Sequence, residues 1–103
     1  MKAVTRVFRA LADPTRRQIL QELKERELAA GEIASRFPIS GPSISRHLSI
    51  LKAADLVSER REGNRILYRL EPDNIAGAMG DFLSSVCPTQ VLYRHRRKGE
   101  SEA

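Results

Sequence analysis

Cysteine occurs only once in the 103 residues, at Cys87, so the chain cannot form an internal disulfide. A disulfide-rich secreted scaffold is thereby excluded, and a reducing compartment such as the cytoplasm is expected. No apolar stretch approaches the roughly 18 residues that a membrane span requires. The N-terminal segment places Arg6 and Arg9 inside its apolar pattern and has no small-residue cleavage site, which excludes a signal peptide. These absences predict a soluble, cytoplasmic protein.

Residue sets that would indicate an enzyme are also missing. The sequence has no phosphate-binding loop, no cluster of metal ligands and no spaced combination of nucleophile, base and acid. Ser43 and His47 stand close in sequence, but no acid lies near enough to complete a catalytic set. We therefore expect no enzymatic activity and no cofactor.

The composition indicates one small globular domain with a basic surface. Hydrophobic residues make up 41% of the chain and charged residues 30%, which is an ordinary globular balance. Lys and Arg total 18 against 13 Asp and Glu, for a formal net charge of +5. That excess favours a polyanionic partner, either nucleic acid or an anionic membrane.

Helical spacing of apolar residues predicts helices over about residues 3–11, 14–26, 30–37, 41–51 and 72–86. Asp13 and Ser40 are suitable N-caps, and each is followed by a proline in the first turn. The helix that begins after Ser40 is expected to be the recognition helix of a helix-turn-helix, because a short helix precedes it.

Before the last helix the pattern changes to that of strands. Val57–Arg61 and Arg65–Leu70 flank the turn sequence Glu62-Gly63-Asn64, which predicts a β-hairpin. We therefore expect residues 1–88 to form a winged helix-turn-helix, mainly α with a small β-hairpin, in the order α-α-α-α-β-β-α. Residues 89–103 carry a basic run and are expected to form a flexible tail.

The predicted recognition helix and the hairpin carry the candidate DNA contacts. Ile44, Leu48 and Leu51 form an inward face, which leaves short or hydrogen-bonding side chains outward, as a major groove requires. Arginines gather around the hairpin turn, where they can reach the backbone or a minor groove. A solvated surface helix and an ordinary charged hairpin are the alternatives. The candidate DNA-binding residues are Ser40, Pro42, Ser43, Ser45, Arg46, His47, Arg61 and Arg65.

Three segments carry a family resemblance. FRALADPTRRQIL, AGEIASRFPISGPSISRHLSILKAADLV and REGNRILYRL resemble the ArsR/SmtB family of bacterial repressors, in particular its branch of autorepressors that bind no metal. The resemblance implies a homodimer formed through the first and last helices, which binds imperfect palindromes in double-stranded promoter DNA. Repressors of that branch can be relieved on a membrane-bound anti-repressor, which nothing in this sequence shows. The implied dimer contacts, for which intramolecular core is the alternative, are Val4, Val7, Phe8, Ile75, Met79, Phe82 and Val86.

The sequence departs from the metal-sensing members of that family. Their Glu-Leu-Cys-Val-Cys-Asp motif corresponds here to residues 27–32, where Ala29 and Gly31 occupy the two thiolate positions. Neither a methyl group nor a hydrogen can ligate a soft metal. The last predicted helix offers Asp73 and Asp81 but no histidine. We therefore expect no metal site.

Three further residues keep their interpretations open. Gly41 stands where many relatives have glutamine, which shifts base contacts onto Ser43, Arg46 and His47. His47 flanks the buried face, so it either touches phosphate or packs with a satisfied ring. Cys87 is either an inert or interface thiol or a redox sensor, although related persulfide sensors use two cysteines.

The predicted function is sequence-specific DNA binding by a dimeric transcriptional repressor of its own or an adjacent operon. The alternative is a winged-helix adaptor that binds proteins and no DNA. Such an adaptor would have a poor or acidic recognition face, whereas this one carries Arg46 beside an arginine-rich hairpin.

Overall fold

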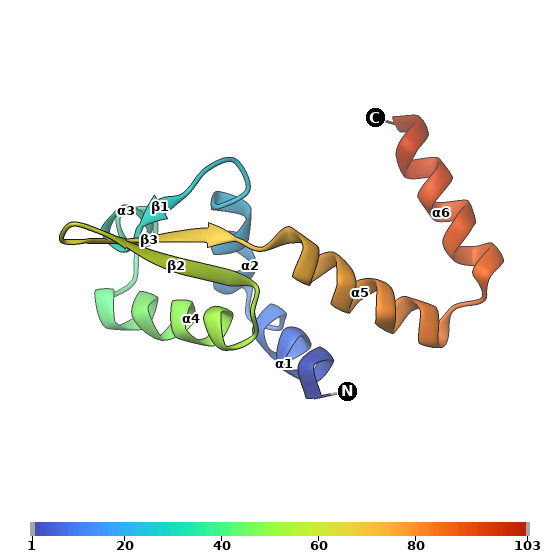
Figure 1. The fold of residues 1–103 in the computed structure, drawn as a ribbon, viewed down its shortest axis with the longest axis horizontal. Coiled ribbons are helices and arrows are strands. Elements are labelled where there is room, and N and C mark those ends of the chain that lie inside the picture. Colours follow the sequence, from blue (N-terminus) through green and yellow to red (C-terminus); the bar gives the residue numbers. More distant parts are fainter. Residues whose placement is uncertain (1, 103) are drawn as a thin grey trace.

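The computed structural model describes residues 2–102, with the side chains of residues 3–95. Figure 1 shows a body of short helices and a small sheet, from which the last two helices extend. The elements in chain order are α1 (Lys2–Leu11), α2 (Pro14–Glu22), β1 (Leu28–Ala29), α3 (Ala30–Ala34), α4 (Gly41–Ala53), β2 (Val57–Glu62), β3 (Arg65–Leu70), α5 (Pro72–Val86) and α6 (Thr89–Glu102).

Side-chain caps begin the two helices that the sequence marks most clearly. The Asp13 carboxylate accepts a hydrogen bond from the Arg16 backbone N–H at 3.0 Å, at the start of α2. Ser40 Oγ accepts from the Ser43 backbone N–H at 3.2 Å, at the start of α4. Both helices have proline in their first turn, where the missing N–H costs nothing. The predicted caps are confirmed.

The core lies between α1–α4 and the inner side of the sheet. Ile19 of α2, Ile33 of α3 and Leu51 of α4 are fully buried, together with Leu28 of β1 and Leu56 before β2. Truncation of one such side chain to alanine typically costs about 2–5 kcal/mol. This core fixes the position of α4 relative to the hairpin.

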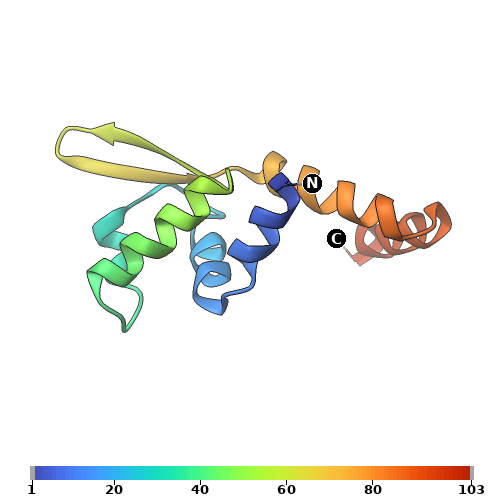
Figure 2. The ribbon, with the colours of Figure 1, turned by 90° about the horizontal axis from the view of Figure 1, so that it is seen from below.

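The sheet has the order β1-β3-β2 and is antiparallel throughout its described strands. Glu62 pairs with Arg65 across the hairpin, so Gly63 and Asn64 form a two-residue turn. Gly63 has a φ of +61°, a conformation that glycine adopts without the steric cost of a side chain. The predicted hairpin is confirmed, and Figures 1 and 2 place its turn at the same end of the molecule as the start of α4.

Local differences from the predicted elements concern short segments. Strand β1 was not predicted; Leu28 and Ala29 pair with Tyr68 and Leu67 of β3, which are distant in sequence. Helix α2 ends at Glu22 rather than near residue 26, because the polar segment 24–26 is exposed and has no apolar residue to pack. Helix α3 likewise ends at Ala34 rather than Phe37.

The C-terminal part of the chain also differs from expectation. Residues 89–102 were expected to form a flexible tail, whereas they continue as helix α6 after the interruption at Pro88. Val91 and Leu92 are half-buried, and α6 turns away from the end of α5 after Pro88 (Figure 1). The division of the chain at residue 88 remains a prediction.

Candidate nucleic-acid interface

Helix α4 separates a buried face from an exposed one. Ile44, Leu48 and Leu51 are at most 2% exposed, and each anchors the helix on the core. Figure 2 shows α4 along the surface of the body. The side chains opposite that buried face are all exposed, as is the Ser40 cap: Pro42, Ser43, Ser45, Arg46 and Ser49. The structure therefore brings the predicted α4 residues together on one accessible face.

The first turn of α4 is built from serines. Besides its bond to the backbone, the Ser40 hydroxyl donates to Ser43 Oγ at 3.0 Å. Ser43 Oγ thus accepts one hydrogen bond and keeps its own O–H for another partner. Gly41 and Pro42 add almost no bulk, so this end of the helix can approach a surface closely.

Arg46 projects from the middle of the exposed face. Within the described residues its guanidinium forms no hydrogen bond and no ion pair. A guanidinium carries five N–H donors in a planar fork, which matches the O6 and N7 acceptors of guanine or a phosphate. Arg46 therefore retains its complete set of donors for a ligand.

His47 lies at the edge of the same face and has one ring nitrogen engaged. Its side chain is 17% exposed, with Nδ1 3.2 Å from Arg16 Nη1. Asp13 Oδ2 lies 4.0 Å from the same nitrogen. The backbone N–H of Arg16 holds the pKa of the Asp13 carboxyl below its usual range, and the charge of Arg16 lowers it further. Of the two interpretations of His47, a packed ring with a satisfied nitrogen therefore describes Nδ1.

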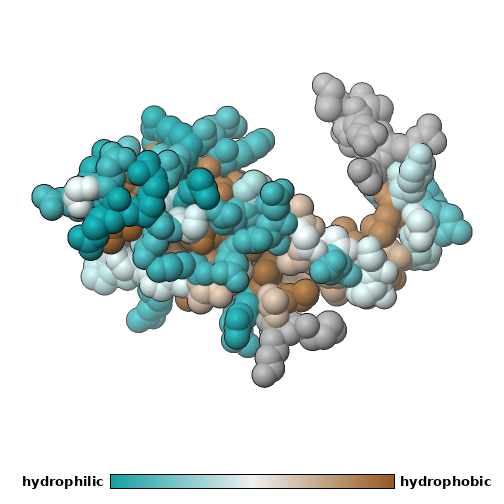
Figure 3. Space-filling view, in the orientation of Figure 1, coloured by the Kyte–Doolittle hydropathy of each residue, from teal (hydrophilic) through white to brown (hydrophobic). Residues whose placement is uncertain are grey.

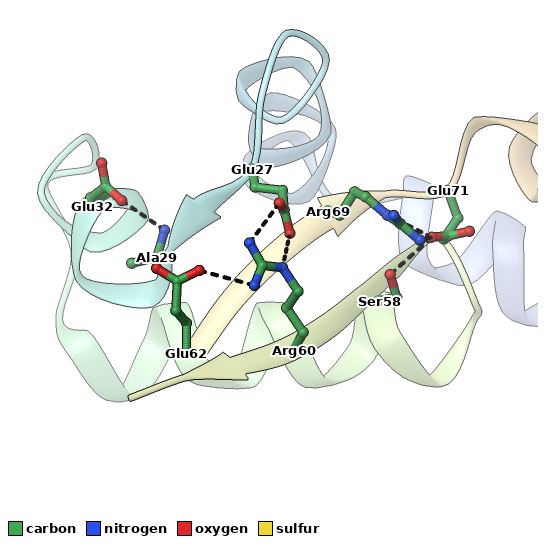
Figure 4. Close-up of polar contacts among 8 residues, drawn as sticks. All are labelled: Glu27, Ala29, Glu32, Ser58, Arg60, Glu62, Arg69 and Glu71. Atoms are coloured by element: carbon green, nitrogen blue, oxygen red, sulfur yellow. Dashed lines mark hydrogen bonds and ion pairs between the residues drawn. The ribbon is translucent and has the colours of Figure 1, made fainter. Parts of the chain in front are cut away.

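Arg60 of the hairpin is held by two carboxylates. Its Nε and Nη2 donate to Glu27 at 2.9 and 3.1 Å, and Nη1 donates to Glu62 at 3.0 Å (Figure 4). These bonds raise the pKa of Arg60 and lower that of Glu27. Arg60 therefore ties β2 to the segment that precedes β1.

Arg65 and Arg69 are paired in the same way. Arg65 Nη2 donates to Glu32 Oε1 at 2.9 Å, and Arg69 Nη2 donates to Glu71 Oε1 at 3.2 Å. Glu32 also accepts the Ala29 backbone N–H at 2.9 Å, the main reason that its pKa is lowered. Arg65, a predicted DNA contact, is thus engaged with α3.

Arg61 is the exception among the hairpin arginines. No carboxylate of the described residues forms an ion pair with it within 4.0 Å, and the more distant Glu59 attracts it. Side chains alternate between the two faces of a strand, so Arg61 shares a face with Glu59 and not with Arg60. Lys52 of α4 pairs with Glu59, which shows that this face is turned toward α4. Arg61 therefore lies on the face of the hairpin that is turned toward α4.

Sequence reasoning missed this division between paired and unpaired arginines. The partners Glu27 and Glu32 are distant in sequence and are brought to the hairpin by the tertiary fold, whereas Glu71 directly follows β3 (Figure 4). The alternation along β2 was a usable signal, because it already places neighbouring residues on opposite faces.

The predicted dimer contacts fall into two groups. Val7 is 3% exposed, and Ile75 and Met79 pack partly against the core, so these residues serve the interior of one chain. Phe8 and Phe82 are 37% and 39% exposed, with ring centroids 4.8 Å apart in an edge-to-face contact.

The exposed group extends along the outer part of α5. Val86 is 60% exposed, Leu83 is 41% exposed although it was not among the predicted contacts, and Val4 of α1 is half-buried. Figure 3 shows apolar side chains gathered along α5 and beside α1, in contrast to the hydrophilic body. We call Phe8, Phe82, Leu83 and Val86 the apolar patch.

The positions considered for metal and redox chemistry lie apart from α4. Ala29 is buried in β1, and the exposed Asp73 and Asp81 line a shallow groove between α1 and α5. No group of three or more potential metal-ligating side chains occurs in the described part of the chain. The Cys87 thiol is half-buried at the end of α5. Among the described residues no helix is long and apolar enough to cross a membrane.

Comparison with known proteins agrees with this geometry. Residues 11–60 match a family model described as a helix-turn-helix domain. The chain is 55% identical over 64 residues to the transcriptional repressor SdpR of Bacillus subtilis (strain 168), which covers 62% of this chain and 71% of that protein. It is 45% identical over 77 residues to the HTH-type transcriptional regulator Rv2034 of Mycobacterium tuberculosis (strain ATCC 25618 / H37Rv), covering 75% and 72% respectively.

A solved structure extends the similarity to nearly the whole chain. The ArsR-like transcriptional regulator from Rhodococcus sp. RHA1 aligns with a TM-score of 0.74 at 29% identity, over 98% of this chain and 92% of that one. The predicted fold, family resemblance and non-enzymatic regulatory function are confirmed. The chain belongs to the ArsR/SmtB family of winged helix-turn-helix transcriptional regulators.

Proposed function

We propose that this protein acts as a homodimeric repressor that binds an imperfect palindromic operator of its own or an adjacent operon, in the cytoplasm. The observation that supports this most directly is the exposed face of α4, where short side chains surround Arg46, which has no partner among the described side chains. A recognition helix needs small residues for close approach to the major groove and a few donors for base edges.

The proposed contacts divide by the chemistry of their side chains. Arg46 contacts a base edge, most simply a guanine, because its donors are free and central on α4. Ser40, Pro42, Ser43 and Ser45, near the start of the helix, contact the adjoining backbone, where helix N–H groups favour phosphate.

The hairpin extends the proposed interface on the side that Arg61 occupies. Arg61 contacts the backbone or the minor groove. Arg65 reaches DNA only by exchanging Glu32 for a phosphate, so its contribution is smaller.

The apolar patch supports association with a second copy of this chain. An exposed cluster of two phenylalanines and two aliphatic side chains is unusual on a small monomer, and its burial is favourable. A two-fold dimer through α1 and α5 would present two copies of α4 to successive major grooves, about 34–36 Å apart. The operator would then have half-sites about one helical turn apart.

A mobility-shift titration on the DNA upstream of the coding sequence tests the proposal, with random DNA of equal length as competitor. Sedimentation of the same sample gives the stoichiometry, and two protomers per operator are expected. Arg46→Ala should weaken specific binding, whereas Lys24→Ala, a matched charge loss in the exposed segment after α2, should not. Equal affinity for operator and random DNA would contradict the proposal and favour the adaptor alternative.

A further inference from the structure

The Arg16 side chain joins three elements through one guanidinium. Nε donates to the Ala10 carbonyl at 2.7 Å and Nη2 donates to the Arg9 carbonyl at 3.0 Å, both in the last turn of α1. The last carbonyls of a helix have no partner within the helix, so a cation there can donate hydrogen bonds to them and also interact with the negative end of the helix dipole. The remaining group, Nη1, lies 3.2 Å from Nδ1 of His47 on α4.

This contact determines which nitrogen of the imidazole carries the proton. A guanidinium only donates hydrogen bonds, so His47 Nδ1 must accept through its lone pair. In a neutral imidazole the proton then resides on the other nitrogen, Nε2. Asp13 does not compete, because its Oδ2 is 4.0 Å from Nδ1 and already accepts the Arg16 backbone N–H at 3.0 Å.

The Nε2–H group is accessible and lacks a protein partner. No hydrogen bond to His47 Nε2 occurs within the described part of the structure. No side-chain nitrogen or oxygen of the described residues is both buried and unsatisfied. Nε2 must therefore be reachable by solvent. It lies across the ring from Nδ1, the nitrogen that contacts Arg16.

We propose that Arg16 is a positioning residue that fixes His47 as the Nε2–H tautomer, so that the recognition helix presents a neutral donor to a DNA phosphate oxygen. The proposal rests on the proposed DNA-binding function and adds the chemistry of one contact and the residue behind it. Phosphate fits this donor better than a base edge, because His47 is largely covered at the rim of the exposed face. Phosphate contacts fix the register of a protein on the duplex and carry no sequence information directly.

Nitrogen-15 NMR of the two histidine rings tests the tautomer, with the exposed His95 as internal reference. At about pH 8, wild-type His47 should show a protonated Nε2 and an unprotonated Nδ1. Arg16→Met should return the ring to a mixture of tautomers. Arg17→Met is the matched control, because Arg17 caps the Leu11 carbonyl at 2.7 Å without touching His47. A wild-type ring protonated at Nδ1 would overturn the proposal.

Affinity measurements test the phosphate contact. The amide nitrogen of glutamine can replace Nε2–H, whereas that of asparagine falls near Nδ1. His47→Asn should weaken binding about tenfold per half-site, as expected for a lost hydrogen bond to a charged group, and His47→Gln should recover most of that loss. The salt dependence should stay unchanged in both, because a neutral donor releases no counterion. Arg16→Met should weaken binding as well, and Arg17→Met should leave it within about threefold of the wild type.

Single methylphosphonate substitutions along the operator locate the phosphate. Neutralising one particular phosphate per half-site should weaken DNA binding by the wild type and have no further effect on DNA binding by His47→Asn. Equal affinity of wild type and His47→Asn, or a loss at that position in both, would refute the contact while leaving the repressor function intact. If the wild type binds no operator at all, the proposed function fails, and this contact fails with it. If Arg16→Met does not fold, Arg16→Lys, which cannot hold both carbonyls and the ring with one ammonium, replaces it.

Discussion

Arg60 and Arg61 are adjacent in sequence and carry the same charge, but they lie on opposite faces of the hairpin. Replacing each by alanine therefore distinguishes an arginine that forms ion pairs within the protein from one that contacts DNA. Arg60 is bonded to Glu27 and Glu62, whereas Arg61 has no carboxylate within 4.0 Å among the described residues. If Arg61 contacts one phosphate per protomer, its loss should reduce the slope of log affinity against log salt by about 0.9 per protomer, and by about 1.8 for a dimer. The advantage of the wild type over Arg61→Ala should then shrink about tenfold between 50 and 200 mM salt.

Fluorescence anisotropy with a labelled operator, titrated over that salt range, measures both slopes. Arg60→Ala should keep the wild-type slope and instead lower the free energy of unfolding slightly, because both of its ion pairs are half-exposed. Urea denaturation checks that cost. Equal reductions in slope for the two variants would refute the inference that ion pairing withdraws Arg60 from DNA. A larger reduction for Arg60→Ala would reverse the assignment of the two faces.

Three other predictions concern assembly, pH and metals. Phe82→Asp should place a carboxylate beside Phe8 in the apolar patch, where an unpaired charge is costly to bury. Sedimentation of this variant should show a monomer or an unfolded chain. A folded dimer would instead show that Phe82 is not part of the interface. Because the pKa of Asp13 is lowered, its contribution to stability is present above about pH 4 and is lost as the pH falls through the lowered value. Asp13→Asn keeps a good N-cap but cannot titrate. Urea titrations should therefore show that this variant loses less stability on acidification than the wild type does. With Ala29 and Gly31 at the thiolate positions, zinc, cadmium or arsenite at modest excess should not release the operator in a mobility shift, and metal-dependent release would reveal a site that the sequence does not indicate.

The parts of this fold that could be predicted from sequence are those that local rules determine. The faces of α4 follow from its helical period, so Ile44 and Leu48 are buried and Arg46 is exposed, as expected. The starts of α2 and α4 follow from Asp13 and Ser40, whose side chains accept the predicted backbone bonds. These features depend on residues no more than one turn away.

The parts that could not be predicted depend on distant segments. Strand β1 has only two residues, and it exists because Leu28 meets Tyr68 of β3, a pairing that no local pattern reveals. The apolar stripe of α5 looks uniform in sequence, yet Ile75 packs against the core while Val86 is 60% exposed. The difference arises because α5 leaves the body of the molecule along its length, a property of the tertiary arrangement (Figure 1).

Net charge is a weak guide to where this protein meets DNA, because most of the hairpin arginines are neutralised in place. The strand register places Arg60, Arg65 and Arg69 on the same face of the hairpin. Each of the three forms an ion pair with a glutamate. These pairs connect the hairpin to the segments before it and after it, so they orient the strands as well as cancel charge. The opposite face keeps Arg61, on the side toward α4 and its unpaired Arg46. The glutamates thus leave the α4-facing side of the hairpin with the arginine that a polyanion can bind without displacing a carboxylate, whereas a polyanion approaching the opposite face meets ion pairs that are already formed.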